Sequence, residues 1–102
     1  MSDPQNINSS ALKVLKVMQA MKGHSLTGVS NTDLAKNLSM SAATVNRCVN
    51  TLIEAGMATQ LETGRYALSV QALSIAQAHA NEMAKASDRI SELTQRVMAG
   101  SY

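Results

Sequence analysis

The side chains best suited to chemistry in this chain are polar groups that recur along one short segment, residues 41–56. With Val45 at the centre of a helical wheel, Cys48, Val49 and Leu52 fall on the same side of a helix. The opposite side carries small and polar residues, namely Ala43, Asn46, Arg47 and Asn50, with Thr44 at its flank. A guanidinium can donate two hydrogen bonds to guanine, and a carboxamide can pair with an adenine edge. The segment therefore predicts a helix that reads bases in a DNA major groove.

An ordinary structural role is open to each of these residues. Arg47 can lie in solvent, paired with Glu54 or Glu62, although the DNA contact is the favoured interpretation. Asn46 or Asn50 can contact only phosphate or water, Thr44 can bond to its own helix, and Ser41 is a helix cap first and a phosphate donor second. The predicted DNA-binding residues are Ser41, Ala43, Thr44, Asn46, Arg47, Asn50, Arg65 and Lys36.

Two helices and a hairpin are expected to position this face. A first helix is predicted from residues 31–33 to residue 38, capped by Ser30 or Asn31, with Leu34, Ala35 and Leu38 on its inner side. Residues 39–41 form the turn, in which Met40 fills the space between the helices. The second helix begins after Ser41 and ends at Gly56. Helix, tight turn, helix and hairpin in this order predict a winged helix-turn-helix.

The hairpin is expected to join residues 57–62 and 65–68 around Thr63-Gly64. Arg65 then lies at the tip of this wing, where it can reach a phosphate or a minor groove, although a charge at such a tip also serves solubility. Lys36 can lie along the DNA backbone, but a plain surface lysine is equally compatible with the sequence. Lys13 and Lys16 are weaker candidates for a contact.

Helices are also predicted on both sides of this segment. One begins near Asn8 or Ser9 and ends at about residue 22, with Gly23 as its stop. Its apolar residues cover more than one stripe: Ala11, Leu12, Leu15 and Met18 form the main face, and Val14, Val17 and Met21 widen it. Such a helix is expected to pack against both the domain core and a partner chain.

A long helix is predicted for residues 70–99, capped by Ser69. A thin heptad seam runs along it through Ala72, Ala76, His79, Met83, Ala86, Ile90, Leu93 and Val97. Because an isolated helix of this kind is marginal in water, it needs a packing partner. The favoured partner is the same helix, or the helix predicted for residues 8–22, of a second copy; the alternative is a helix folded back on its own domain.

Length and composition agree with one small helical domain. The chain has 102 residues and neither Trp nor Phe, so aliphatic residues and Met must form the core. The expected class is mainly α with a small β-hairpin: a disordered lead at 1–7, a winged helix-turn-helix at 8–69, and a C-terminal dimerisation helix at 70–102. The formal net charge of +2 is compatible with phosphate contacts but is weak evidence by itself.

Several classes of function find no support in the sequence. Cys48 is the only cysteine and is predicted to be a small core residue, so no intrachain disulfide forms. His24 and His79 are far apart and lack further ligands, and no catalytic set or phosphate loop is present, so neither a metal, a cofactor nor an enzyme is expected. No signal peptide or membrane span is visible, which favours a cytoplasmic, nucleoid-associated protein.

The segment from Leu26 to Ser69 resembles the N-terminal DNA-binding domain of IclR-type transcriptional regulators. The likeness rests on residues 33–38, on the recognition-helix segment Ser41–Arg47, on Leu52–Gly56, and on the wing sequence Gly64–Leu68, and it covers roughly residues 11–75. Such proteins normally continue into an effector-binding domain, which is not expected in this chain. The turn before the recognition helix often carries a basic residue in this family, whereas Ser41 and Ala42 stand here.

These observations together predict a sequence-specific transcriptional regulator that acts as a homodimer on a near-palindromic site in double-stranded DNA. Repression is the more common outcome for a small binder, and prophages and other mobile elements carry compact regulators of this kind. Two other functions remain open: a winged helix used for protein interaction or assembly, and non-specific DNA binding.

Overall fold

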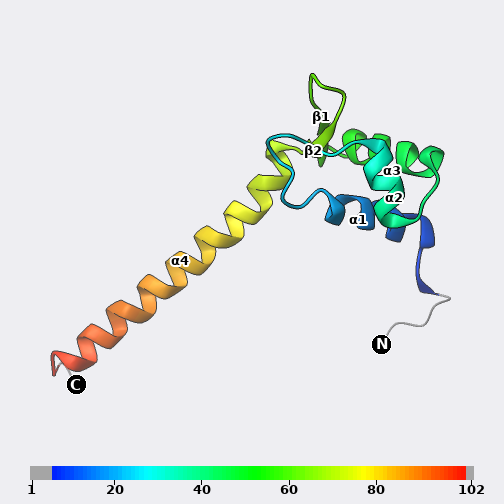
Figure 1. Cartoon of the computed structure of the whole chain (residues 1–102). Coiled ribbons are helices and arrows are strands. Elements are labelled where there is room, and N and C mark those ends of the chain that lie inside the picture. The colour runs from blue at the N-terminus through cyan, green and yellow to red at the C-terminus, as the bar shows by residue number, and fades with distance from the viewer. Residues whose placement is uncertain (1–5, 101–102) are drawn as a thin grey trace. The chain divides into compact units, whose positions relative to one another are not determined.

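The computed structural model describes residues 6–100, and the chain divides into two compact units between Ala72 and Leu73. The elements follow in the order α1 (Ser9–Ala20), α2 (Asn31–Leu38), α3 (Ala42–Glu54), β1 (Ala58–Gln60), β2 (Tyr66–Leu68) and α4 (Val70–Met98) (Figure 1). The predicted class, mainly α with a small hairpin, is confirmed. The expected disordered lead lies outside the described residues, apart from Asn6 and Ile7.

The predicted helix starts are confirmed, because each one has a side chain that caps a free backbone N–H group. Asn8 Oδ1 accepts from Ala11 N at 3.0 Å at the start of α1. Ser30 and Ser41 do the same for α2 and α3, each at 3.1 Å. Ser69 Oγ accepts from Ala72 N at 3.1 Å at the start of α4. Four short polar side chains thus fix where the helices of this fold begin.

The turn between α2 and α3 is built on a residue in the left-handed conformation. Ser39 has φ 54° and is the only non-glycine residue with positive φ among those described. Its neighbour Met40 donates a backbone hydrogen bond to Ala35 O at 3.0 Å, which closes the end of α2. The Met40 side chain packs against the core cluster, as the sequence predicts. This tight turn holds α3 close to α2.

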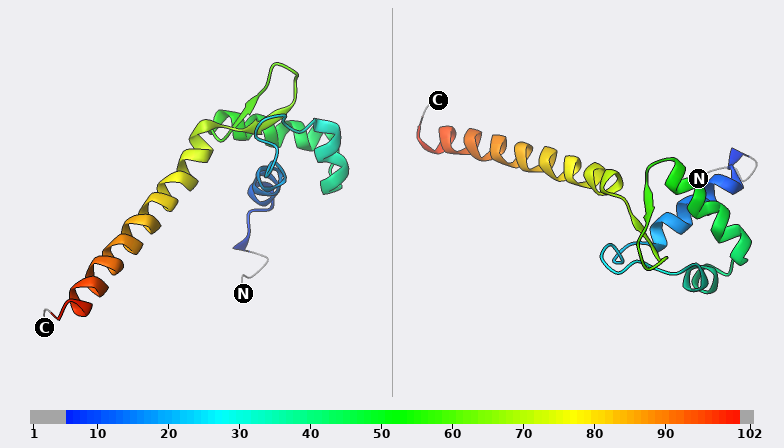
Figure 2. Two further views of the ribbon diagram at one scale, coloured as in Figure 1. Left: turned by 60° about the vertical axis from the view of Figure 1, so that its left-hand side comes forward. Right: turned by 90° about the horizontal axis from the view of Figure 1, so that it is seen from above.

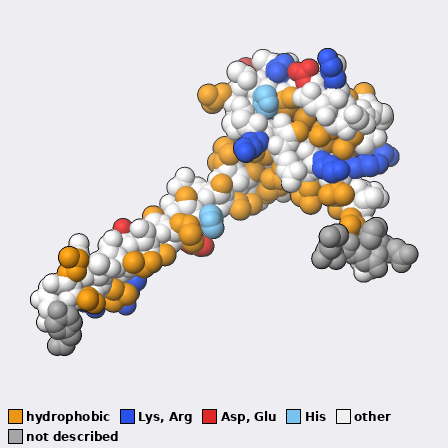
Figure 3. Space-filling view, turned by 60° about the horizontal axis from the view of Figure 1, so that its bottom comes forward, with side chains coloured by type: hydrophobic (Ala, Val, Ile, Leu, Met, Phe, Trp, Pro, Cys, Tyr) orange, Lys and Arg blue, Asp and Glu red, His pale blue; other side chains and the backbone are white. Residues whose placement is uncertain are grey.

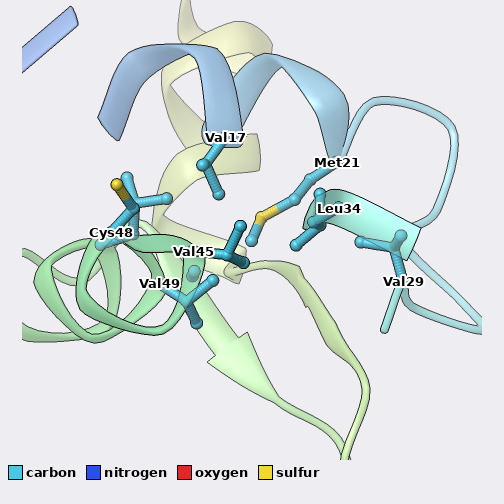
Figure 4. Close-up of a cluster of buried hydrophobic side chains, with 9 residues drawn as sticks. Val17, Met21, Val29, Leu34, Val45, Cys48 and Val49 are labelled. Atoms are coloured by element: carbon cyan, nitrogen blue, oxygen red, sulfur yellow. The ribbon is translucent and has the colours of Figure 1, made fainter. Parts of the chain in front are cut away.

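The core lies where α1, α2 and α3 meet. Val17, Met21, Leu34, Val45 and Val49 have no exposed surface, and Figure 4 shows Met21, the residue that follows α1, pointing between Leu34 and Val45. Burial of these side chains supplies most of the driving force for folding.

The structure shows which side of α1 faces the core, a choice that the sequence left open. Leu12 and Leu15 remain 41% and 53% exposed, whereas Val17 and Met21 are fully buried. Apolar residues surround so much of this helix that periodicity could not select the arc that meets α3. The consequence is a face of α1 bearing Leu12 and Leu15 that the other residues of the first unit between positions 6 and 72 leave partly exposed.

The wing is a short antiparallel hairpin, in which Ala58 pairs with Leu68 and Gln60 with Tyr66. Its loop extends as a narrow ribbon from the end of α3 (Figure 2). Val29, in the loop between α1 and α2, forms an isolated antiparallel β-bridge with Tyr66 that the sequence did not predict. Val29 and Tyr66 exchange two backbone hydrogen bonds, both 2.8 Å long. The α1–α2 loop is therefore tied to the base of the wing.

Helix α4 spans 29 residues, close to the predicted 70–99. Ala72 in its first turn is buried and belongs to the first unit. From Leu73 onward every described residue of the helix is exposed. None of the described helices combines the length and the apolar character that a membrane span needs.

Candidate nucleic-acid interface

The outer face of α3 has the orientation that the sequence predicts. Val45, Cys48, Val49 and Leu52 are buried, while Ala43, Asn46, Arg47 and Asn50 are exposed. Within residues 6–100, the side chains of Asn46, Arg47 and Asn50 make no hydrogen bond or ion pair, so the alternative pairing of Arg47 with Glu54 or Glu62 is not found there. Their polar groups are therefore available to a ligand. That DNA is this ligand remains a prediction.

Ser41 and Thr44 shape the start of this face. Ser41 Oγ accepts from Thr44 N at 3.1 Å and donates to Thr44 Oγ1 at 2.9 Å. The Ser41 hydroxyl is thus engaged as a cap, whereas the hydroxyl hydrogen of half-buried Thr44 remains free to be donated. Asn31 Nδ2, at the start of α2, donates to Ala42 O at 3.3 Å and braces the first turn of α3 against α2.

Lys36 is exposed on α2, one residue beyond the half-buried Ala35. Within the described part of the chain its side chain takes part in no hydrogen bond or ion pair. Its predicted contact with the DNA backbone stays a prediction.

Arg65 does not extend freely from the wing tip, contrary to the expectation from sequence. Its Nε donates to Thr27 O at 3.1 Å and to Gly28 O at 3.2 Å, and a terminal nitrogen donates to Gly28 O at 3.0 Å. Gly28 has φ +75°, and a Cβ atom there would lie 2.9 Å from Arg65 Cβ. Only a glycine fits this close approach. The guanidinium therefore braces the α1–α2 loop against the wing.

Two substitutions of Arg65 distinguish the contribution of its hydrogen bonds to stability from the contribution of its positive charge. We expect Arg65→Ala to lower the free energy of unfolding by about 1–3 kcal/mol, because the carbonyls of Thr27 and Gly28 lose a charged donor. Arg65→Lys keeps the charge but cannot reach two carbonyls with a planar fork, so it should lose most of the same stability. Urea denaturation of both variants measures this; a Lys variant as stable as the wild type would contradict the brace.

A cleft between α1 and α3 adjoins the outer face of α3, and sequence reasoning did not anticipate it. Its volume is about 230 Å³, and its lining consists of Ser10, Lys13, Val14, Thr44, Arg47, Cys48 and Thr51. The lining carries two cations and no carboxylate, so it is suited to an anion. Cys48, 5% exposed, is the predicted small core residue and also borders this cleft.

Lys13, which the sequence predicts to be only a weak candidate for a DNA contact, lines this cleft. On a helical wheel it lies at the polar edge of α1, and no local signal distinguishes it from Lys16. Only the packing of α1 on α3, through Val17 and Val45 among others, brings Lys13 to the same cleft as Arg47. Figure 3 shows a group of Lys and Arg side chains at the right-hand edge of the winged unit, with other basic side chains elsewhere on the same face.

Comparison with known proteins agrees with this architecture. A family model described as the IclR helix-turn-helix domain matches residues 10–62, just over half of the chain. No curated protein matches the chain.

Three solved structures are similar to the chain. An IclR family transcriptional regulator from Brucella abortus is 21% identical, with a TM-score of 0.64 over 74% of this chain and 29% of that one. A protein from Silicibacter sp. TM1040 described as an ICLR transcriptional regulator is 29% identical, with a TM-score of 0.62 over 78% and 32% of the two chains. HmgR of Pseudomonas aeruginosa is 26% identical, with a TM-score of 0.60 over 76% and 32%.

The chain thus spans about a third of the length of these relatives. The matched residues contain α2, α3, β1 and all of α1 except Ser9, and these elements include the exposed face of α3 and the helices that pack against it. The chain belongs to the IclR helix-turn-helix family of transcription-regulator DNA-binding domains.

Proposed function

We propose that this chain binds a specific double-stranded DNA sequence as a homodimer and regulates transcription, most simply by repression. The observation that carries the proposal is the exposed face of α3. Asn46, Arg47 and Asn50 project from it without partners among the described residues, while the opposite face is fixed in the core. These are the side-chain types that read guanine and adenine edges in the major groove.

A dimer is needed for tight binding, because each chain carries only nine Lys and Arg residues against seven Asp and Glu. Two copies double the number of phosphate contacts and present two recognition helices to successive major grooves.

The exposed leucines of α1 supply part of the surface for a contact between the two copies. Leu15 and Met18 line a groove of about 400 Å³ together with Gln19, Lys22 and Leu68, and most of its lining is apolar. The heptad seam of α4 is the second candidate surface.

Lys13 extends the proposed DNA contact from α3 to α1. In the cleft that it lines with Thr44, a DNA phosphate would meet the Lys13 ammonium and the hydroxyl of Thr44, while Arg47 at the same cleft remains free for a base. This phosphate contact would fix the register of the recognition helix without itself reading a base.

We expect Lys13→Ala to weaken binding to all duplexes and to reduce the slope of log affinity against log salt by about one per protomer. Lys16→Ala is the matched control, because Lys16 is exposed on the same helix and does not line the cleft. Fluorescence anisotropy over a salt series measures both slopes. Equal slopes for the two variants would remove Lys13 from the interface.

Selection of bound sequences from a random duplex pool tests the proposal as a whole. A homodimeric reader should enrich a near-palindromic consensus with half-sites about one helical turn apart. Retention of DNA without any enriched sequence would indicate non-specific binding instead. Failure to retain DNA at low salt would overturn the proposal and favour a protein-interaction module, for which the exposed leucines of α1 would be the contact surface.

A further inference from the structure

Helix α4 carries an apolar stripe that no described part of the chain covers. Met83, Ile90 and Leu93 are 54%, 64% and 46% exposed, and Figure 3 shows apolar side chains at intervals along the helix. Ala76 and His79, which precede Met83, and Ala86, which follows it, complete the heptad pattern. Ala72 is only 9% exposed, so it is unavailable to a partner and the usable seam begins at Ala76. A seam of this kind requires a second helix.

We propose that the second helix is α4 of another copy, and that the two helices run antiparallel with Met83 facing Ala86 of the second copy. This inference rests on the homodimer of the proposed function and specifies its geometry. A twofold axis then passes between residues 84 and 85, and each facing pair occurs twice.

The sizes of the seam residues favour the antiparallel arrangement. In a parallel pair each residue faces its own copy, so Ala76 meets Ala76 and Ala86 meets Ala86, which leaves gaps. The same arrangement forces His79 against His79. In the antiparallel register Ala76 faces Leu93 of the second copy, and Ala86 faces Met83 of the second copy. Each of these alanines thus has a large apolar partner. His79 faces Ile90 of the second copy, so the two imidazoles are kept apart.

The charges beside the seam favour the same arrangement. Glu82 and Arg89 occupy equivalent heptad positions on one flank of the seam. In the antiparallel register Glu82 lies beside Arg89 of the second copy, so two opposite-charge pairs form by symmetry. A parallel pair would place these residues beside Ser87 and Thr94 instead. An antiparallel shift by one heptad would place either Glu82 or Arg89 beside its own copy, which like-charge repulsion disfavours.

Charge reversal tests the pairing in the full chain. We expect Glu82→Arg to weaken the dimer by roughly tenfold, because both attractive pairs become repulsive. The double variant Glu82→Arg/Arg89→Glu should restore wild-type dimerisation. Asp88→Arg is the matched control, because Asp88 lies on the helix face opposite the seam. Sedimentation equilibrium measures the dissociation constants, and a double variant no tighter than Glu82→Arg would contradict the pairing.

Disulfide trapping tests the direction of the helices. In a Cys48→Ala background, a mixture of Ala76→Cys and Leu93→Cys chains should yield a mixed disulfide, whereas neither chain alone should crosslink. Self-crosslinking of each chain alone would indicate a parallel pair and overturn the inference, while leaving the proposed homodimer intact. A wild-type chain that sediments as a monomer would overturn both this inference and the dimer, independently of any DNA binding.

Discussion

Replacement of Arg47 by alanine is expected to abolish most of the sequence preference of the protein. Arg47 is exposed on α3 and unpaired among the described residues, so its guanidinium is free to make a bidentate contact with guanine. Such a contact accounts for about 1–3 kcal/mol, or roughly fivefold to 150-fold in affinity per half-site. Anisotropy titrations against the selected duplex and a scrambled duplex should show the two affinities converging.

Arg47→Lys is the informative companion to this variant. Lysine keeps the positive charge in the cleft shared with Lys13, but it lacks the rigid fork that matches guanine. It should therefore retain binding to scrambled DNA and lose preference for the selected site. Unchanged affinity and preference in Arg47→Ala would remove Arg47 from the readout.

Leu34→Ala is expected to have the largest effect on stability. Leu34 of α2 is fully buried in the core, and truncation of such a leucine lowers the free energy of unfolding by about 2–5 kcal/mol. A single core of this size rarely supplies more than about 3–5 kcal/mol in total. The winged unit of the variant should therefore be largely unfolded at 37 °C, and DNA binding should be lost with it. Urea denaturation followed by circular dichroism measures the change.

Leu26→Ala is the matched control for this prediction. Leu26 is 94% exposed in the loop between α1 and α2, so its truncation should change the free energy of unfolding by less than about 0.5 kcal/mol. Equal losses in the two variants would mean that the core does not lie between α1, α2 and α3.

Local signals in the sequence were sufficient to predict the helices and the hairpin. Ser30, Ser41 and Ser69 are capping residues that immediately precede apolar periodic segments, and each caps the helix that it was expected to cap. The 3.6-residue periodicity also identified both faces of α3 correctly. These features depend on residues within one or two turns of each other, and such features are visible in a single sequence.

Features that depend on distant packing could not be predicted in the same way. Arg65 bonds to carbonyls 37 and 38 residues earlier in the chain, and nothing near Arg65 in the sequence indicates this partner. The choice of Val17 and Met21 over Leu12 and Leu15 as the inner face of α1 is set by the neighbouring helices. The same packing brings Lys13 to the cleft beside Arg47. Each of these revisions concerns a place where two segments remote in sequence meet.

Contact between DNA and the outer face of α3 is tested most directly by amide chemical-shift mapping during titration with the selected duplex. We expect the largest shifts at Ala43, Asn46, Arg47 and Asn50, with smaller shifts at Lys13 in the neighbouring cleft. Large shifts confined to α4 or to the leucines of α1, with the α3 amides unchanged, would contradict this contact.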